Sequence, residues 1–197
     1  MDNSINEAVE VLRKGGLILY PTDTVWGIGC DATNEQAVAK VFALKKRDDA
    51  KALVLLASDL DMIARYIKEI PQIAIDLVEV NDAPMTIIYP GAVCSESGKS
   101  HRGALAPNTV AEDGSVGIRI PLTDNCLELV KRLGRPLVST SANISGEPTP
   151  KNFAQIDEEI KQGVDFVVNP ELEKQSLGKA SQIIKVGLDS QVKIIRG

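Results

Sequence analysis

The sequence contains few of the residues on which several classes of active site depend. His101 is the single histidine among 197 residues, which excludes a metal site built from several histidines. It also disfavours a Ser-His-Asp triad, because this one imidazole would have to serve whatever nucleophile exists. The cysteines, Cys30, Cys94 and Cys126, are widely spaced and form no Cys-x-x-Cys pair, which argues against a disulfide framework and a zinc knuckle.

Long apolar runs and a strong charge imbalance are also missing. No run approaches the roughly 20 apolar residues that a membrane helix needs, and the N-terminus shows no secretory signal. We therefore expect a cytoplasmic protein without membrane contacts. The formal net charge of −5 provides no general attraction to nucleic acid, so any phosphate-binding surface must be local. A hydrophobic content of 44% is enough for a core, and we expect one domain over residues 1–197.

Helical and strand patterns alternate along the chain, which predicts an α/β fold with a largely buried sheet. Apolar stripes and capping signals predict helices at residues 4–14, 34–44, 58–67, from 71 onward, and 127–133. Short apolar runs predict strands at residues 17–20, 52–56, 86–89, 116–120, 136–140, 182–186 and 192–195.

Two polar segments follow predicted buried strands. Residues 21–31 read Pro-Thr-Asp-Thr-Val-Trp-Gly-Ile-Gly-Cys-Asp, and residues 139–146 read Ser-Thr-Ser-Ala-Asn-Ile-Ser-Gly. Loops at strand ends in α/β sheets are where ligands bind, and hydroxyl groups with exposed glycine N–H groups suit a small polar ligand. Each segment could instead be a capped turn, and the second lacks a base for a serine nucleophile.

Cationic residues occur in two contrasting settings. Lys45, Arg47 and Lys51 surround a tight connection, where they either form a solvated face or converge on one triphosphate. Arg119 lies within an otherwise apolar strand and must be paired there. Its partner is either an internal carboxylate or the carboxylate or phosphate of a ligand.

Residues 95–100, Ser-Glu-Ser-Gly-Lys-Ser, resemble the end of a phosphate-binding P-loop. That motif needs glycine where Val93 stands, and a following helix, which Gly103 and Pro107 interrupt. The segment is better interpreted as part of a long, mobile loop over residues 91–114, which lacks periodicity.

Four motifs in order carry a resemblance to a known family. They are Pro-Thr-Asp-Thr-Val-x-Gly-x-Gly-Cys-Asp-Ala from residue 21, Lys-x-Arg from 45 with a lysine four residues on, Val-Gly-x-Arg-x-Pro from 116, and Ser-Thr-Ser-Ala-Asn-x-Ser-Gly from 139. Together they are similar to the short form of the threonylcarbamoyl-AMP synthase (YrdC-like) family, over about residues 15–197. The resemblance implies a single YrdC-like domain with a twisted mixed β-sheet and flanking helices.

The resemblance also implies an enzyme. Its reaction would condense L-threonine, bicarbonate and ATP to threonylcarbamoyl-AMP and pyrophosphate, for threonylcarbamoyladenosine modification of tRNA. ATP would carry magnesium on its phosphates, and the carbamate nucleophile would need no side-chain base. The other partners implied are tRNA and tRNA-modification proteins. Two alternatives are a paralogue that carbamoylates another acceptor and a non-catalytic RNA-binding relative, which would need Lys40, Lys45, Lys46 and Lys51 to form one basic patch.

The resemblance assigns site residues position by position, with no metal ligand among them. The catalytic set is Lys45, Arg47, Ser141 and Asn143. The ATP contacts are Arg47, Lys51, Ser115, Ser141, Thr149 and Arg196. The threonine contacts are Thr24, Arg119, Ser139 and Ser181.

Three departures from the family pattern bear on the acceptor. Leu56 stands where the family often has histidine, so one expected substrate contact is lost. Trp26 replaces a usual tyrosine, and residues 91–114 differ from the common pattern. These changes leave room for a different acceptor amine, and we expect the 91–114 loop to close over the substrates.

Overall fold

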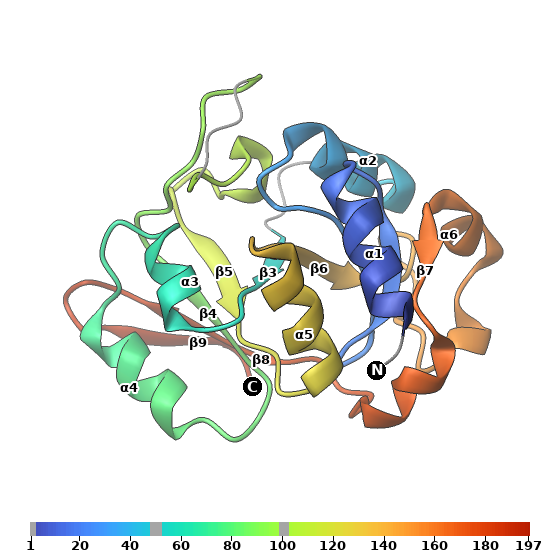
Figure 1. Cartoon of the computed structure of the whole chain (residues 1–197). Helices are drawn as coiled ribbons and strands as arrows, with labels where there is room; N and C mark the ends of the chain where they lie inside the picture. The colour runs from blue at the N-terminus through green and yellow to red at the C-terminus, as the bar shows by residue number, and fades with distance from the viewer. Residues whose placement is uncertain (1–2, 48–52, 99–102) are drawn as a thin grey trace.

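The computed structural model describes residues 3–47, 53–98 and 103–197. Its described strands form one sheet in the order β7-β1-β2-β6-β3-β5-β4-β8-β9 (Figure 1). The pairs β1–β7, β3–β5 and β4–β8 are parallel and the other neighbours antiparallel, so the sheet is mixed, as predicted. The strands are β1 (Ile18–Pro21), β2 (Trp26–Gly29), β3 (Val54–Leu56), β4 (Met85–Tyr89), β5 (Val116–Arg119), β6 (Leu137–Ser141), β7 (Phe166–Val167), β8 (Gln182–Val186) and β9 (Val192–Arg196).

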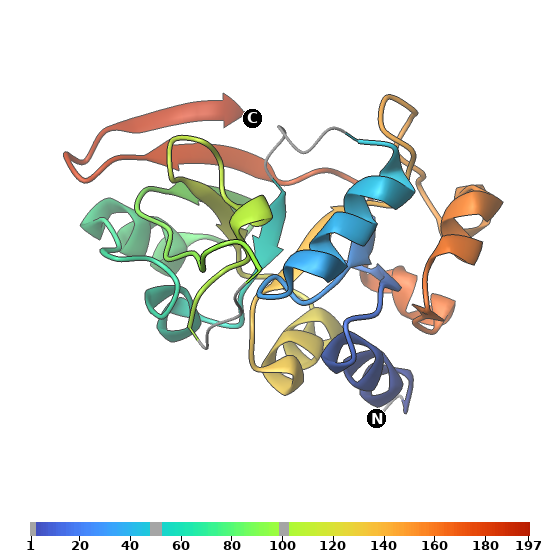
Figure 2. The same ribbon diagram turned by 90° about the horizontal axis from the view of Figure 1, so that it is seen from above.

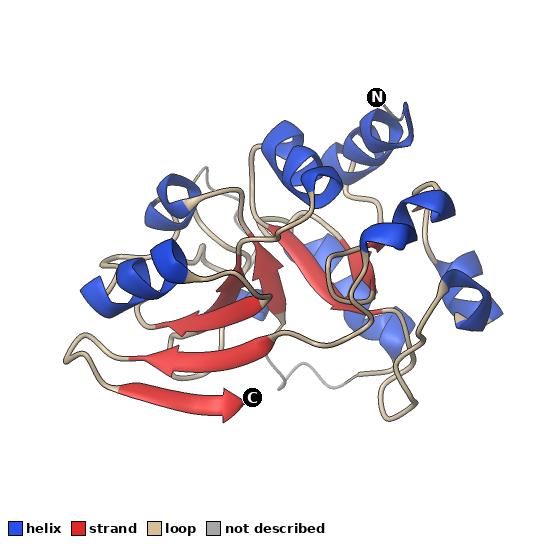
Figure 3. Ribbon diagram, turned by 90° about the horizontal axis from the view of Figure 1, so that it is seen from below, coloured by secondary structure: helices blue, strands red, loops and turns tan. Residues whose placement is uncertain are grey.

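Helices cover one face of this sheet. Figure 3 shows α1, α3, α4 and α5 together on that side; the N-terminus lies beside α1 and the C-terminus at the end of the edge strand β9. The helices are α1 (Asn3–Arg13), α2 (Glu35–Lys45), α3 (Leu60–Ala64), α4 (Gln72–Val80), α5 (Asp124–Leu133) and α6 (Glu158–Gly163), with 3₁₀ turns η1 (Pro107–Thr109), η2 (Phe153–Gln155) and η3 (Pro170–Gln175). No helix within the described ranges is long and apolar enough to cross a membrane.

The alternation of strand side chains separates a core face from a polar face. Leu55, Ile87, Ile118 and Val138 are 0–1% exposed and belong to the core. Their sequence neighbours point the other way because side chains alternate along a strand. The opposite face therefore receives the polar residues of the predicted site.

The predicted elements are largely confirmed, with corrections at their ends. The strand predicted at 182–186 has the same bounds as β8. The strand predicted at 192–195 is β9, which is one residue longer and lies at the edge of the sheet (Figure 2). Helix α2 is capped by Asn34, whose side chain accepts a hydrogen bond from the Ala37 N–H. Two strands were missed. Residues 26–29 were interpreted as part of a turn but form β2, and the two-residue β7 is too short for a periodic signal.

The described parts of the 91–114 segment are held by hydrogen bonds. The backbones of Cys94 and Leu105 form an isolated β-bridge, and Leu105 is fully buried. The Ser97 hydroxyl and the Gly98 N–H donate to the carboxylate of Glu35 at 2.7 Å. Lys99, Ser100, His101 and Lys51 lie outside the described residues.

Candidate active site

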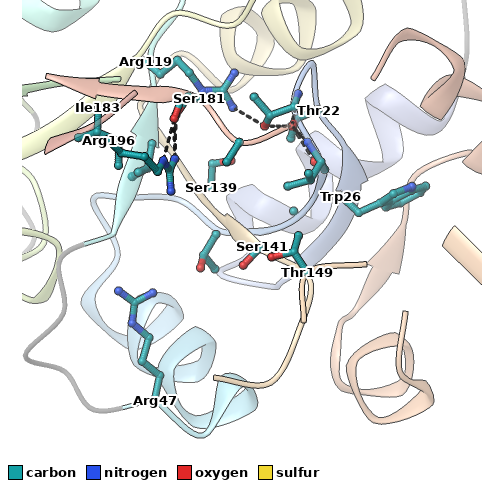
Figure 4. A pocket seen from close by; sticks show the side chains of 16 residues that line it. Thr22, Trp26, Arg47, Arg119, Ser139, Ser141, Thr149, Ser181, Ile183 and Arg196 are labelled. Atoms are coloured by element: carbon teal, nitrogen blue, oxygen red, sulfur yellow. Dashed lines mark hydrogen bonds between the residues drawn. The ribbon is translucent and has the colours of Figure 1, made fainter. Parts of the chain in front are cut away.

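A cavity of about 290 Å³ lies on the polar face of the sheet (Figure 4). Its wall includes three arginines and several hydroxyl groups, and no Asp or Glu occurs among its described lining residues. Eight of the predicted site residues line it together: Thr24, Arg47, Arg119, Ser139, Ser141, Thr149, Ser181 and Arg196. In Figure 4, Arg119 and Arg196 approach from one side of the view and Arg47 from the other.

Strand register explains how distant segments meet there. Ser139 on β6 lies opposite Val54 on β3, and Ser141 lies opposite Gly27 on β2. Arg119 on β5 lies opposite Thr86 on β4. Opposed residues share a face of the sheet, so polar residues of β4, β5 and β6 are brought to one surface, beside Gly27 of β2 and Val54 of β3.

Arg119 is buried and its charge is compensated inside the protein. Its guanidinium donates to the carboxylate of Asp23 and, at 3.3 Å, to the hydroxyl of Thr24. Asp23 also accepts a bond of 3.1 Å from the Leu122 N–H. The internal ion pair considered from the sequence therefore exists, and the arginine lines the cavity as well. Its partner fixes the guanidinium beside the cavity before any ligand arrives.

The turn that carries Asp23 and Thr24 is organised by Thr22. The Thr22 hydroxyl accepts from the Thr24 and Val25 N–H groups at 3.1 and 3.2 Å and donates to the Val25 carbonyl at 2.7 Å. Such hydroxyl-to-backbone bonds stabilise tight turns. Thr22 lines the cavity too, although sequence reasoning did not select it.

Lys45 lies behind the cavity wall. Its ammonium, 2% exposed as a residue, donates to the backbone oxygens of Ser141 at 2.5 Å and Asn143 at 2.6 Å. Burial, with a smaller effect from the charge of Arg47, lowers the pKa of Lys45 to about 8. The residue therefore holds the chain at the end of β6 and does not line the cavity.

Asn143 lies beyond the cavity, in a neighbouring depression that shares Thr149 with it. Its amide nitrogen donates to the Ile144 and Glu147 carbonyls at 3.0 and 2.9 Å, and its buried Oδ1 accepts no hydrogen bond within the described structure. Two members of the predicted catalytic set, Lys45 and Asn143, thus support the wall that Ser141 and Arg47 form.

Arg47 follows the end of α2 and is partly buried. Its guanidinium carbon lies 6.0 Å from the centre of the Phe42 ring, and burial lowers the pKa of the arginine from its ordinary value. Lys46, between Lys45 and Arg47, points elsewhere and forms an exposed ion pair with Glu159 at 2.8 Å. The three consecutive cationic residues 45–47 therefore have different environments: Lys45 is buried against backbone oxygens, Lys46 is paired at the surface, and Arg47 lines the cavity.

Ser115 belongs to a second cavity, of about 630 Å³, which shares Val54 and Ile183 with the first. Its hydroxyl donates to Asp113 at 2.5 Å, and Lys185 donates to the other oxygen of Asp113 at 2.5 Å. Lys185 first, and then Ser115, lower the pKa of Asp113 to about 2. Ser115 therefore lines the cavity next to the one that the other predicted site residues line.

Comparison with known proteins identifies the family. A family model described as Telomere recombination (Sua5_yciO_yrdC) matches residues 10–197. The chain belongs to the Sua5/YciO/YrdC family. Threonylcarbamoyl-AMP synthase from Stutzerimonas stutzeri (strain A1501) is 34% identical over 172 residues, which are 85% of each chain. The enzyme of the same name from Hahella chejuensis (strain KCTC 2396) is 32% identical over 180 residues, or 91% of each chain.

Solved structures agree with the family assignment. Sua5 from P. abyssi in complex with L-threonine superposes with a TM-score of 0.75 and 26% sequence identity. It covers 92% of this chain, which spans only half of the P. abyssi chain. E. coli YciO gives a TM-score of 0.75 at 23% identity, over 98% of this chain and 87% of its own, and shows the likeness of fold.

Within this family, two departures can now be placed. Leu56 is fully buried and lies directly opposite Arg119 in the β3–β5 register, although it does not line the cavity. Trp26 is buried at the cavity wall and its indole N–H donates to Glu173 at 2.7 Å. Its ring lies 5.1 Å from that of Phe153. The tryptophan therefore joins the cavity to the 153–173 segment, a contact that no local sequence signal could reveal.

Proposed function

We propose that the chain is an L-threonylcarbamoyladenylate synthase, a nucleotidyltransferase that uses L-threonine, bicarbonate and ATP. The threonine amine and bicarbonate form a carbamate with loss of water. A carbamate oxygen then attacks the α-phosphorus of ATP, and the bond to the leaving pyrophosphate breaks. The observation that carries the proposal is the gathering of three arginines and a set of hydroxyls in one cavity, in a chain whose relatives are named threonylcarbamoyl-AMP synthase.

The Arg119 end of the cavity suits an amino acid. A guanidinium already oriented by Asp23 can pair with a carboxylate, and Thr24, Ser139 and Ser181 supply hydroxyl groups around it. These groups are fixed by strand register and by internal hydrogen bonds. They cost little to organise when a ligand binds.

The Arg47 end suits the phosphates of ATP. Arg47 supplies positive charge there, and Ser141 and Thr149 supply hydroxyls. Arg196, which approaches from the Arg119 side, is proposed to contact ATP as well. Lys51 is proposed to join them from outside the described residues. Because the two cavities share Val54 and Ile183, one ATP molecule can extend past them toward Ser115.

Catalysis in this proposal is positioning and charge stabilisation, because the carbamate is already an anionic nucleophile. Lys45 and Asn143 act by holding the end of β6, and Arg47 and Ser141 face the reacting phosphate. No cluster of three or more metal-ligating side chains occurs within the described residues. Magnesium is therefore expected to arrive as the complex with ATP and to be held mainly by phosphate oxygens.

The proposed product is a reactive mixed anhydride that serves threonylcarbamoyladenosine modification of tRNA. We propose that residues 1–197 act as one catalytic domain in the cytoplasm, with tRNA-modification proteins as downstream partners. The RNA-binding alternative needed one continuous lysine patch. Instead, Lys45 is buried against carbonyls, Lys46 pairs with Glu159, and Lys40 donates to the Gly15 carbonyl at 3.1 Å.

The direct test is an assay of product. The protein is incubated with magnesium, ATP, ¹³C-labelled bicarbonate and L-threonine, and the adenylate and pyrophosphate are measured by mass spectrometry and a coupled assay. We expect labelled threonylcarbamoyl-AMP only when all three substrates are present. Leu56 makes a second acceptor worth testing in the same assay. A labelled adenylate formed with another amine but not with threonine would contradict the proposal.

A further inference from the structure

Thr86 is a buried polar residue to which the resemblance assigned no role. It lies on β4, is 1% exposed, and its hydroxyl is 2.8 Å from that of Ser181. Thr86 belongs to the wall of the second cavity, whereas Ser181 lines the first. The hydrogen bond between them therefore crosses the partition between the two cavities.

Arg196 provides a second contact to Ser181. Its Nε and one terminal nitrogen donate to the Ser181 carbonyl at 2.9 and 2.7 Å, and the same terminal nitrogen approaches the Ser181 hydroxyl at 3.5 Å. Figure 4 shows Arg196 directed toward Ser181. A guanidinium has no acceptor, so Arg196 occupies a lone pair of the Ser181 hydroxyl.

The direction of the Thr86–Ser181 bond follows from the available acceptors. Within residues 3–47, 53–98 and 103–197, the only hydrogen-bond partner of the Thr86 hydroxyl is Ser181. If Ser181 donated to Thr86, the buried Thr86 proton would have no acceptor, which is costly. Thr86 therefore donates, and it fills the second lone pair of Ser181.

The hydroxyl proton of Ser181 then has no acceptor among the described residues. With both lone pairs engaged by Thr86 and Arg196, Ser181 can only donate to a ligand in the cavity.

We propose that Thr86 is a positioning residue that fixes Ser181 as a hydrogen-bond donor to a carboxylate oxygen of the amino-acid substrate. The inference rests on the proposed function, because it assumes that the cavity binds threonine.

The test compares two variants of Thr86. Thr86→Val keeps the shape but removes the hydroxyl, and Thr86→Ser keeps the hydroxyl but removes the methyl group. Binding of L-threonine is measured by calorimetry, together with kcat and KM and the melting temperature of each variant. We expect T86V to raise the Kd and KM for threonine about threefold to tenfold, the size of one net hydrogen bond. The melting temperature should change little, and T86S should stay within about twofold of wild type in threonine binding.

A double-mutant cycle with Ser181→Ala shows whether Thr86 acts through Ser181. We expect S181A to weaken threonine binding at least as much as T86V and the double variant to equal S181A. Wild-type affinity in T86V, equal losses in T86S and T86V, or independent effects in the double variant would each overturn the inference. A wild-type chain that binds no threonine would overturn the proposed function as well.

Discussion

The ammonium of Lys45 donates a hydrogen bond of 2.5 Å to the backbone oxygen of Ser141. A second bond, of 2.6 Å, reaches the oxygen of Asn143, so one buried charge anchors the chain where it leaves β6. Burial lowers the pKa of Lys45 to about 8, with the charge of Arg47 as a smaller cause. The hydroxyl of Ser141 on the cavity wall thus depends on a group that titrates near neutral pH.

This depressed pKa predicts a pH dependence of stability. Below about pH 8 Lys45 is protonated in both states, and the folded protein carries the cost of a buried charge. Between about 8 and the ordinary value of 10.5, the unfolded chain binds more protons than the folded one, so the Lys45 contribution to stability rises with pH. We expect urea unfolding to show this rise as the difference between wild type and Lys45→Met.

The comparison with Lys45→Met is needed because other buried groups make the stability fall as the pH rises. Burial raises the pKa of Cys126 to about 11 and that of the Tyr20 hydroxyl further, so the folded state keeps protons that the unfolded chain loses at high pH. Lys46→Met, which removes an exposed lysine, is the matched control. If wild type and K45M keep a constant difference over this pH range, Lys45 carries no depressed pKa.

Arg47→Ala should mainly damage the use of ATP. Losing one charge-assisted phosphate contact costs about 1.5–3 kcal/mol, which corresponds to roughly a tenfold to hundredfold rise in the KM for ATP. The KM for threonine should change less, because the threonine contacts proposed for Arg119 lie elsewhere on the cavity wall. Steady-state kinetics with ATP and threonine varied separately measure both quantities.

Lys46→Gln is the control for Arg47, because it changes a neighbouring charge that is paired with Glu159 outside the cavity. We expect it to have nearly wild-type kinetics. A folded R47A variant with unchanged ATP affinity and turnover would show that Arg47 belongs to a solvated face.

Apolar periodicity predicted the main features of the fold, because it is a local property, and the family resemblance predicted eight residues of the cavity wall. Hydrogen-bond partners that lie across the sheet could not be predicted in either way. Arg119 visibly needed a partner, but only the folded chain shows that Asp23, 96 positions away, provides it. Thr86 resembles an ordinary strand residue in the sequence, because the hydrogen-bond partner of its hydroxyl, Ser181, lies 95 positions away.

Lys45 illustrates a different limit. A lysine at the end of a helix beside Lys46 and Arg47 is expected to be solvated, and its sequence neighbours give no other indication. Its burial results from the chain returning at Ser141 and Asn143, which lie 96 and 98 positions away. Helix α2 could be predicted locally, whereas the surroundings of its last residue depend on tertiary packing.

Asp23→Ala should strongly destabilise the protein. It leaves the buried guanidinium of Arg119 without its carboxylate, and breaking a buried ion pair from one side costs about 3–5 kcal/mol. Urea unfolding measures the loss. The double variant Asp23→Ala, Arg119→Met should recover part of it, because no unpaired charge remains. A loss in D23A that is no larger than in the double variant would show that the pair contributes little to stability.

The last prediction concerns the acceptor. Serine keeps the hydroxyl of threonine and lacks only its methyl group, so we expect its kcat/KM to be lower by about tenfold or more. Glycine also lacks the hydroxyl, which leaves the hydroxyl groups of the cavity wall without that partner, and its kcat/KM should be lower again by roughly two orders of magnitude or more. Adenylate formation with each amino acid at saturating ATP and bicarbonate measures these ratios. Leu56→Met, a volume-conserving change beside Arg119, is the control for packing and should keep the order. Equal rates with threonine, serine and glycine would mean that the cavity does not recognise the side chain, and that leucine at position 56 marks an enzyme with another acceptor.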